Sequence, residues 1–298
     1  MNILITGASG FIGERLLDAA ITLWGKDSVT AFSSRKIEGC YSIVYNKSLP
    51  GFGLQAADLA RIENVDVLIH AGAYTPKSGG EANIFSACNG NVYFTEELLK
   101  LPFSKLSRIL FVSTLDVYAS ATPISELTPT VPATLYGWSK LYCEQMVSLF
   151  AREKKINHTI LRVGHVYGPG EEKYAKFLPK TIASILAGGT VELYGDGAEL
   201  RSFIYIDDVV TALLAAVDLA EQVSVINIVG GTAVSIKTVL DELVAISGRP
   251  VEIVRREFSG VKRDFVFDTT LLKKYLLPQE TPFLSGLNAE FAYFESLK

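Results

Sequence analysis

Tyr136 and Lys140 are four positions apart, and together their side chains can transfer a proton. Residues at this spacing lie on one face of a helix, so we expect the Lys140 ammonium near the Tyr136 phenol. A free phenol has a pKa of about 10, and a neighbouring cation lowers this pKa because it favours the phenolate. Such a tyrosine can take a proton from an alcohol or give one to a ketone. The spacing alone is not specific, because the chain contains 13 tyrosines.

Two neighbouring residues with hydroxyl groups precede this helix in the sequence. Ser113 and Thr114 follow the apolar run 109–112, which is typical of a buried strand. The carboxyl ends of such strands are where open α/β sheets bind ligands. We therefore expect the Thr114 hydroxyl to hold the same substrate oxygen as Tyr136.

The first residues of the chain predict a strand, a glycine-rich turn and a helix. An apolar run at 2–5 is followed by Gly7, Gly10 and Gly13 and then by apolar residues at helical spacing. Backbone N–H groups at a helix N-terminus are unpaired and bind phosphate, so this turn is a candidate pyrophosphate site. The alternative is a glycine-rich loop without a ligand. The candidate ligands in the turn are Gly7, Ser9, Gly10, Phe11, Ile12 and Gly13.

Two further features bear on which dinucleotide would bind. In dinucleotide folds an acidic residue about 20 positions past the glycines bonds the adenosine ribose. Here Ser33 stands at that place, followed closely by Arg35 and Lys36, which favours NADP over NAD. The alternative is a solvated pair of cations in a loop. Asp58 and Leu59 are candidates for the adenine contact, although Asp58 can equally be a helix cap.

Composition limits the possible classes of protein. The chain has 298 residues, 49% of them hydrophobic, and a net charge of −4 without a basic run. This composition indicates a globular domain and gives no support for a nucleic-acid or membrane partner. The three cysteines and three histidines are dispersed, so we expect no metal site and reduced thiols. With no signal peptide before the first strand, we expect a cytoplasmic protein.

The alternation of apolar runs and helical stretches predicts an α/β fold with a doubly wound parallel sheet. Strands are expected at 29–32, 42–45, 67–70, 109–113 and 159–163, and helices at 54–62, 81–100 and 136–154. After residue 168 the pattern changes. We predict a dinucleotide-binding domain over 1–168 and a smaller mixed α/β substrate lobe over 169–298, partly interleaved with it. In the lobe we expect helices near 174–187 and after 207 and 235, strands at 191–194, 203–206, 225–229 and 251–254, and a C-terminal tail.

Taken together, these segments resemble the extended short-chain dehydrogenases/reductases of the nucleotide-sugar epimerase/dehydratase branch, which have a Rossmann domain. The resemblance covers nearly the whole chain and is specific for the family rather than for the substrate. The segments that carry it are 6–13, 58–59, 70–73, 91–92, 113–118, 126–129, 132–140, 161–170, 194–197 and 201–208.

The resemblance implies a role for individual residues. Tyr136 would be the acid/base, Lys140 its activator and a ribose ligand, and Thr114 the hydroxyl that orients the substrate. The cofactor would also contact Ala71, Gly72, Ala73, Asn91, Ser113 and, at the nicotinamide end, Val163. The substrate, a nucleotide-diphosphate sugar, would contact Arg201 through its diphosphate, with Arg256 or its neighbour Arg255 assisting and His165 as a further ligand or a core residue.

Departures from the family pattern narrow the expected reaction. Leu115 replaces the acid that sugar dehydratases use, so dehydration is disfavoured, and Asp116 is left to cap or orient. Reduction of a 4-keto-6-deoxy nucleotide sugar by NADPH is favoured over 4-epimerisation with retained NAD, because the cofactor site suggests NADP. A non-catalytic NADP sensor is the third alternative. The resemblance also implies a homodimer built from four helices, in which Leu98, Leu99, Met146 and Phe150 are candidate contacts unless they belong to the core.

Overall fold

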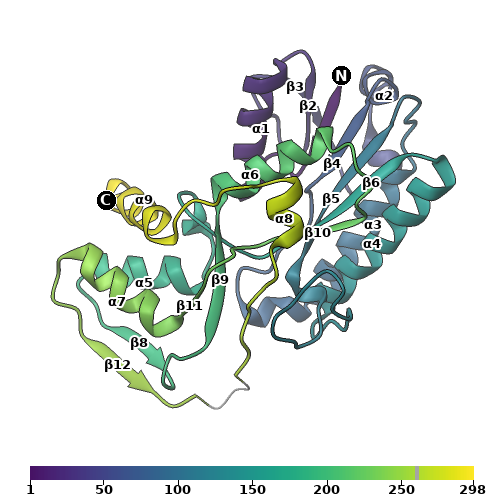
Figure 1. Cartoon of the computed structure of the whole chain (residues 1–298). Helices are drawn as coiled ribbons and strands as arrows, with labels where there is room; N and C mark the ends of the chain where they lie inside the picture. The colour runs from purple at the N-terminus through teal and green to yellow at the C-terminus, as the bar shows by residue number, and fades with distance from the viewer. Residues whose placement is uncertain (259–261) are drawn as a thin grey trace.

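The computed structural model describes residues 1–258 and 262–298 and shows an α/β fold around one large parallel sheet (Figure 1). Every pair of neighbouring strands in this sheet runs parallel. The predicted doubly wound parallel sheet is confirmed. Its seven strands, in spatial order, are β10 (Val225–Ile228), β6 (Asn157–Val163), β5 (Arg108–Thr114), β4 (Val67–His70), β1 (Ile3–Thr6), β2 (Val29–Ser33) and β3 (Tyr41–Val44).

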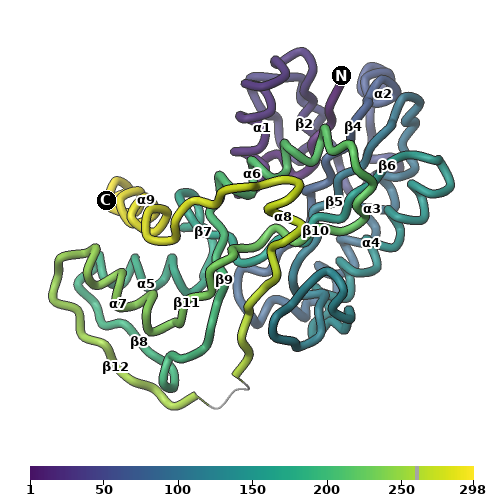
Figure 2. The backbone as a smooth tube through the Cα atoms, in the orientation of Figure 1, coloured from purple at the N-terminus to yellow at the C-terminus, as the bar shows by residue number. Residues whose placement is uncertain are grey.

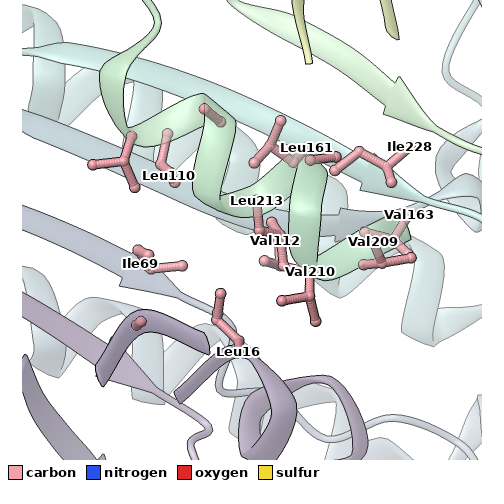
Figure 3. Close-up of a cluster of buried hydrophobic side chains, with 14 of the residues drawn as sticks. Leu16, Ile69, Leu110, Val112, Leu161, Val163, Val209, Val210, Leu213 and Ile228 are labelled. Carbon is pink, nitrogen blue, oxygen red and sulfur yellow. The ribbon is translucent and has the colours of Figure 1, made fainter. Parts of the chain in front are cut away.

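Helices cover both faces of the sheet because most of its strands are apolar on both sides. One face packs against α1 (Phe11–Trp24), α6 (Ile206–Ala215) and α8 (Thr270–Tyr275). Figure 3 shows Leu16 from α1 and Val210 and Leu213 from α6 meeting strand residues of this face. The other face packs against α2 (Ala56–Glu63), α3 (Phe85–Leu99) and α4 (Leu135–Lys154).

The strand order reverses at β1, and this reversal places the ligand site. Strands β2 and β3 lie on one side of β1, and β4, β5 and β6 on the other. Crossover helices therefore leave β1 and β4 toward opposite faces, which opens a crevice at their carboxyl ends. The glycine turn after β1, the loop after β4 and Thr114 at the end of β5 all lie at this edge.

A second group of elements forms the smaller lobe (Figure 2). It contains a three-stranded sheet, β11-β9-β7, and a two-stranded sheet, β12-β8. The strands are β7 (His165–Tyr167), β8 (Val191–Tyr194), β9 (Leu200–Tyr205), β11 (Ala233–Ser235) and β12 (Ile253–Arg256), and the helices are α5 (Phe177–Leu186), α7 (Ile236–Ser247) and α9 (Phe283–Ser296).

The C-terminal part differs from the sequence expectation. The expected tail contains α8 and α9, and the short strand β7 was not predicted. In Figures 1 and 2 the chain after residue 262 runs back to α8 beside β10 and then crosses to α9 in the smaller lobe. Since β10, α6 and α8 all pack into the large-sheet layers, the division after residue 168 stays a prediction. No helix among the described residues is long and apolar enough to cross a membrane.

Candidate functional site

The turn between β1 and α1 is built for close approach of an anion. Gly7 has a φ of 71°, and a Cβ on Gly13 would lie 1.9 Å from the Gly7 carbonyl oxygen, so neither position accepts a side chain. Gly10 precedes α1 and makes no side-chain cap. The first N–H groups of α1 thus remain available to a pyrophosphate, with the positive end of the helix dipole behind them.

A cavity of about 1320 Å³ extends from this turn along the carboxyl ends of β4, β5 and β6 into the smaller lobe. This volume is large enough for a dinucleotide and a second ligand together. The cavity brings together most of the residues expected from the sequence. These are Gly7, Ser9, Gly10, Phe11, Ile12, Gly13, Ala71, Gly72, Ala73, Asn91, Ser113, Thr114, Tyr136, Lys140, Val163, His165 and Arg201.

Tyr136 and Lys140 lie in the first turns of α4, with Thr134 as its N-cap. The Lys140 ammonium donates to the Val112 carbonyl oxygen at 2.7 Å and lies 4.2 Å from the centre of the Phe111 ring. Burial lowers the pKa of Lys140 to about 8, because the charged form loses its hydration. Lys140 is therefore held on the wall of the cavity by the end of β5.

The pKa of the Tyr136 phenol is raised, first by burial and then by the nearby Asp116 carboxyl. Hydrogen bonds with the hydroxyls of Thr75 and Thr114 act in the opposite direction. The expected lowering of this pKa by Lys140 is not found: burial and Asp116 raise the pKa, and Lys140 is not among the groups that act on it. Thr114 Oγ1 lies 3.3 Å from Asp116 Oδ2, and burial also raises the pKa of Asp116.

A buried chain of hydrogen bonds supports the loop after β4. Thr6 Oγ1 accepts from the Gly72 N–H at 2.9 Å and contacts His70 Nδ1 at the same distance. The other ring nitrogen of His70 lies 3.0 Å from Thr95 Oγ1. Asn91 Oδ1 accepts from the Tyr74 N–H at 2.6 Å. These bonds fix the backbone of 71–74 against the glycine turn, a role for His70 that the sequence did not reveal.

The end of the cavity in the smaller lobe, where the substrate is expected, carries Arg201 and His165. The Arg201 guanidinium lies 5.0 Å from the Phe265 ring and donates to the Arg263 carbonyl oxygen at 2.7 Å. His165 is enclosed by aromatic rings, and burial together with the Arg201 cation lowers its pKa to about 3. It is therefore neutral, and its Nδ1 has no hydrogen-bond partner among the described residues.

Arg256 does not reach this cavity. It is exposed on β12 and pairs with Glu192 at 3.0 Å. Arg263 is the second arginine beside Arg201, with its guanidinium 4.5 Å from the same Phe265 ring. Hydrogen bonds between residues 263–265 and 200–202 bring this distant segment to β9, a placement that the sequence alone does not reveal.

The adenosine end of the cavity also differs from the sequence expectation. Ser33 Oγ bonds Ser9 Oγ at 3.2 Å, and Arg35 pairs with Glu14 at 2.9 Å, and neither residue lines the cavity. Asp58 belongs to the capping box of α2, the alternative considered above, and neither it nor Leu59 lines the cavity. Residues of separate loops and of α3 line this end instead and were not predicted: Tyr45, Lys47, Ser48, Phe52 and Phe94.

Comparison with known proteins agrees with this geometry. The sequence profile described as "NAD dependent epimerase/dehydratase family" matches residues 3–229. The chain belongs to this family. The expectation that it is an enzyme of the extended short-chain dehydrogenase/reductase type is confirmed.

Individual relatives are distant in sequence but similar in structure. A trifunctional UDP-glucose 4,6-dehydratase/UDP-4-keto-6-deoxy-D-glucose 3,5-epimerase/UDP-4-keto-L-rhamnose-reductase from Arabidopsis thaliana is 25% identical over 98% of this chain, and the match spans only 47% of that enzyme. An uncharacterized UDP-glucose epimerase from Bacillus subtilis is 29% identical over 100% of this chain and 99% of its own length. The UDP-glucuronic acid 4-epimerase from Bacillus cereus, solved with UDP-glucuronic acid and NAD, is 25% identical over 100% of both chains, with a TM-score of 0.85.

Proposed function

We propose that this family member is an NAD-dependent 4-epimerase of a nucleotide-diphosphate sugar. One observation carries the proposal: a single cavity joins the uncapped N-terminus of α1 to Tyr136, Thr114 and Lys140 and continues to Arg201. A dinucleotide and a sugar nucleotide would meet at Tyr136. The related 4-epimerase of known structure, which binds NAD and a UDP-sugar, supports the same assignment.

When bound, NAD would accept a hydride from C4 of the sugar and then return it to the keto sugar. Tyr136 takes the proton of the sugar hydroxyl as it is oxidised and returns a proton to the keto oxygen afterwards. Its raised pKa keeps the phenol protonated at neutral pH, so ionisation has to be assisted by the charge of Lys140. The Thr114 hydroxyl, which interacts with the Tyr136 phenol, would orient the same substrate oxygen.

The nucleotide part of the substrate would lie in the smaller lobe. Arg201 and Arg263 place two guanidinium groups against one ring, which suits a diphosphate because each group is planar and permanently charged. His165 is neutral and would act there as a hydrogen-bonding group rather than as a cation.

A second candidate is the NADPH-dependent reduction of a 4-keto-6-deoxy nucleotide sugar, as first favoured from the sequence. The observation behind it is that Ser33, not a carboxylate, ends β2 and that Arg35 and Lys36 follow. Arg35 would then leave Glu14 to meet a 2′-phosphate. Both reactions use the same Tyr136, Thr114 and Lys140.

One set of measurements separates the two candidates. One sample of the purified protein is denatured to release and identify bound nucleotide. The native protein is tested with UDP-glucose and UDP-glucuronic acid by product NMR, and with a 4-keto-6-deoxy nucleotide sugar plus NADPH by absorbance. Retained NAD and interconversion of C4 epimers without net redox change are expected. NADPH consumption with no epimer formed would replace the proposal by the reductase. Turnover with none of these substrates would contradict both.

We further propose a homodimer. Of the expected contacts, Leu98 is fully buried in the core, and Leu99 and Phe150 pack against that core. Other apolar residues are exposed on the packed helices α3 and α4, and Trp138, Tyr142 and Leu149 share one face of α4. A second copy of the chain is the partner proposed for this surface, which consists of Phe85, Tyr93, Trp138, Tyr142 and Leu149.

A further inference from the structure

Two carboxyl groups are buried together between the C-terminal helix and the segment that follows β7. Glu290 on α9 is 0% exposed, and Glu171 is 2% exposed. Each carboxyl influences the pKa of the other, so the two groups face each other. Among the described residues, Glu171 Oε2 and both carboxyl oxygens of Glu290 have no hydrogen-bond partner. Ionised carboxylates only accept hydrogen bonds, so a proton held between the two groups would supply the donor that these buried oxygens lack.

The pair is connected to the cavity through Lys176, at the start of α5. The Lys176 ammonium lies 3.4 Å from Glu171 Oε1, and both residues line the cavity. This cation also lies close enough to Asp116 to influence the pKa of that carboxyl, so it belongs to the same end of the cavity. Lys176 and Glu171 are therefore the cavity-lining members of a row of three ionisable side chains.

The charges of Glu171, Glu290 and Lys176 indicate how many protons the two carboxyl groups hold. Two ionised carboxylates and one ammonium leave a net negative charge in a buried place, which is costly. One proton makes the cluster neutral and supplies the missing hydrogen-bond donor. Burial and the facing carboxyl raise the pKa of Glu290, and burial raises that of Glu171.

We propose that Glu171 and Glu290 share one proton at neutral pH and thereby hold the Lys176 ammonium in place at the substrate end of the cavity. Glu290 is then a positioning residue for the substrate, although it lies on the last helix of the chain. This role rests on the proposed function, because that function makes this end of the cavity the nucleotide-sugar site.

The surroundings of Glu290 contain few other groups that titrate. Tyr167 of β7 and Tyr205 of β9 face it, and burial raises the pKa of both phenols. Asp208 lies behind them, where it accepts hydrogen bonds from Thr281. The helices α5 and α7 present apolar residues and Thr181 toward the interior. The carboxyl pair is therefore the group here that changes charge nearest to neutral pH.

The shared proton leads to a prediction about the pH dependence of folding stability, which can be tested without a substrate. The unfolded carboxyls release their protons near pH 4.3, while the folded pair keeps one to higher pH. Its contribution to stability is thus complete below the unfolded pKa and is lost as the pH rises through the raised folded pKa. Glu290→Gln keeps the shape and supplies an N–H donor that does not titrate.

The first experiment measures the thermal midpoint of the holoprotein from pH 6 to pH 9. We expect the wild-type midpoint to fall more than that of Glu290→Gln, by about 3 °C or more. Glu295→Gln, an exposed carboxylate on the same helix, is the control and is expected to follow the wild type. Glu171→Gln tests the pair from the other side if Glu290→Gln does not fold. Equal slopes for the wild type and either pair variant would overturn the proposal.

The second experiment tests the positioning of Lys176. The Kd of UDP-glucose for the NAD-loaded protein is measured by calorimetry at pH 7 and pH 9. We expect about fivefold weaker binding by the wild type at pH 9 and no such change for Glu290→Gln. Glu171→Gln should weaken binding about as much as Lys176→Met, and the double variant no more than Lys176→Met alone.

These outcomes separate the proposal from the proposed function. Additive losses in the double variant would show that Glu171 does not act through Lys176. If the wild type does not bind UDP-glucose or any other nucleotide sugar, the proposed function and the positioning role both fail, while the melting experiment still decides whether the proton is shared.

Discussion

At the scale of single residues, the phenol of Tyr136 decides whether the site is catalytic. Its pKa is raised by burial, so Tyr136 holds its proton until a substrate oxygen and a charged partner favour the transfer. We expect Tyr136→Phe to lower kcat by about 100-fold or more, because it removes the proton but not the ring. Product NMR measures turnover, and NAD retention should stay within about threefold. Tyr142→Phe, exposed six positions later on α4, is the control. Unchanged turnover would refute the acid/base role.

Arg35 is the residue whose side chain would distinguish the two cofactors. It is 66% exposed and pairs with Glu14, so it is free to exchange this partner for a phosphate. If NADP binds here, Arg35→Ala should weaken NADPH about tenfold and NADH less than twofold, measured by fluorescence titration. Arg152→Ala, exposed near the end of α4, is the control. Equal weakening of both cofactors would remove the basis for NADP.

Much of the candidate site could be predicted because its residues come in short segments of the sequence. The glycine turn, Ser113 with Thr114, and Tyr136 with Lys140 each lie within one local segment, and the sheet topology brings these segments to one cavity. Arg263 was missed because contacts with residues far away in the sequence, in β9 and after β5, determine its position. For Asp58 the sequence left two alternatives, and the structure shows the capping one, since Asp58 lies in the first turn of α2.

At the scale of elements, the prediction worked where burial imposes a clear pattern. Strands such as β4 are buried throughout, because helices cover both of their faces. The strand β7 has three residues and α8 has six, which is too short for a recognisable period. Helix α9 was missed for another reason: Glu290 is a charged residue on its buried face, which interrupts the apolar stripe.

A buried ion pair connects α4 to β5 and β6. Arg162 donates to both carboxylate oxygens of Glu144, at 3.0 and 2.7 Å, and Ser113 donates to the same carboxylate at 2.6 Å. Arg162→Met leaves the Glu144 charge buried without its partner, so we expect a loss of about 3–5 kcal/mol in the free energy of unfolding. Urea denaturation measures this loss.

Two further variants complete that test. Arg162→Met with Glu144→Leu should recover much of the stability, because no unpaired charge remains. Asp241→Asn, which breaks the exposed pair with Lys237, is the control and should have a small effect. If Arg162→Met is no more destabilising than this control, the ion pair does not hold α4 against the sheet.

At the scale of the whole molecule, the chain passes between the two groups of elements more than once. Strand β10, α6 and α8 return to the large sheet, while α9 ends in the smaller lobe (Figure 1). The sequence predicted this interleaving only in part, since α8 and α9 were expected to be a tail. Because the cavity is lined from both groups, changes in the packing of α9 are expected to reach the substrate end.

The exposed apolar surface on α3 and α4 leads to the last prediction, which concerns assembly. Tyr142 is 59% exposed and Trp138 is 51% exposed, one helical turn apart. A stable dimer buries about 800 Å² on each partner with an apolar centre, and a carboxylate placed there is desolvated without a partner. We expect the wild type to elute as a dimer in light-scattering chromatography at about 10 μM and Tyr142→Glu to shift to monomer. Leu23→Glu, equally exposed on α1, should remain dimeric, because α1 lies outside the proposed surface. A monomeric wild type, or a dimer that survives Tyr142→Glu, would exclude this surface as the interface.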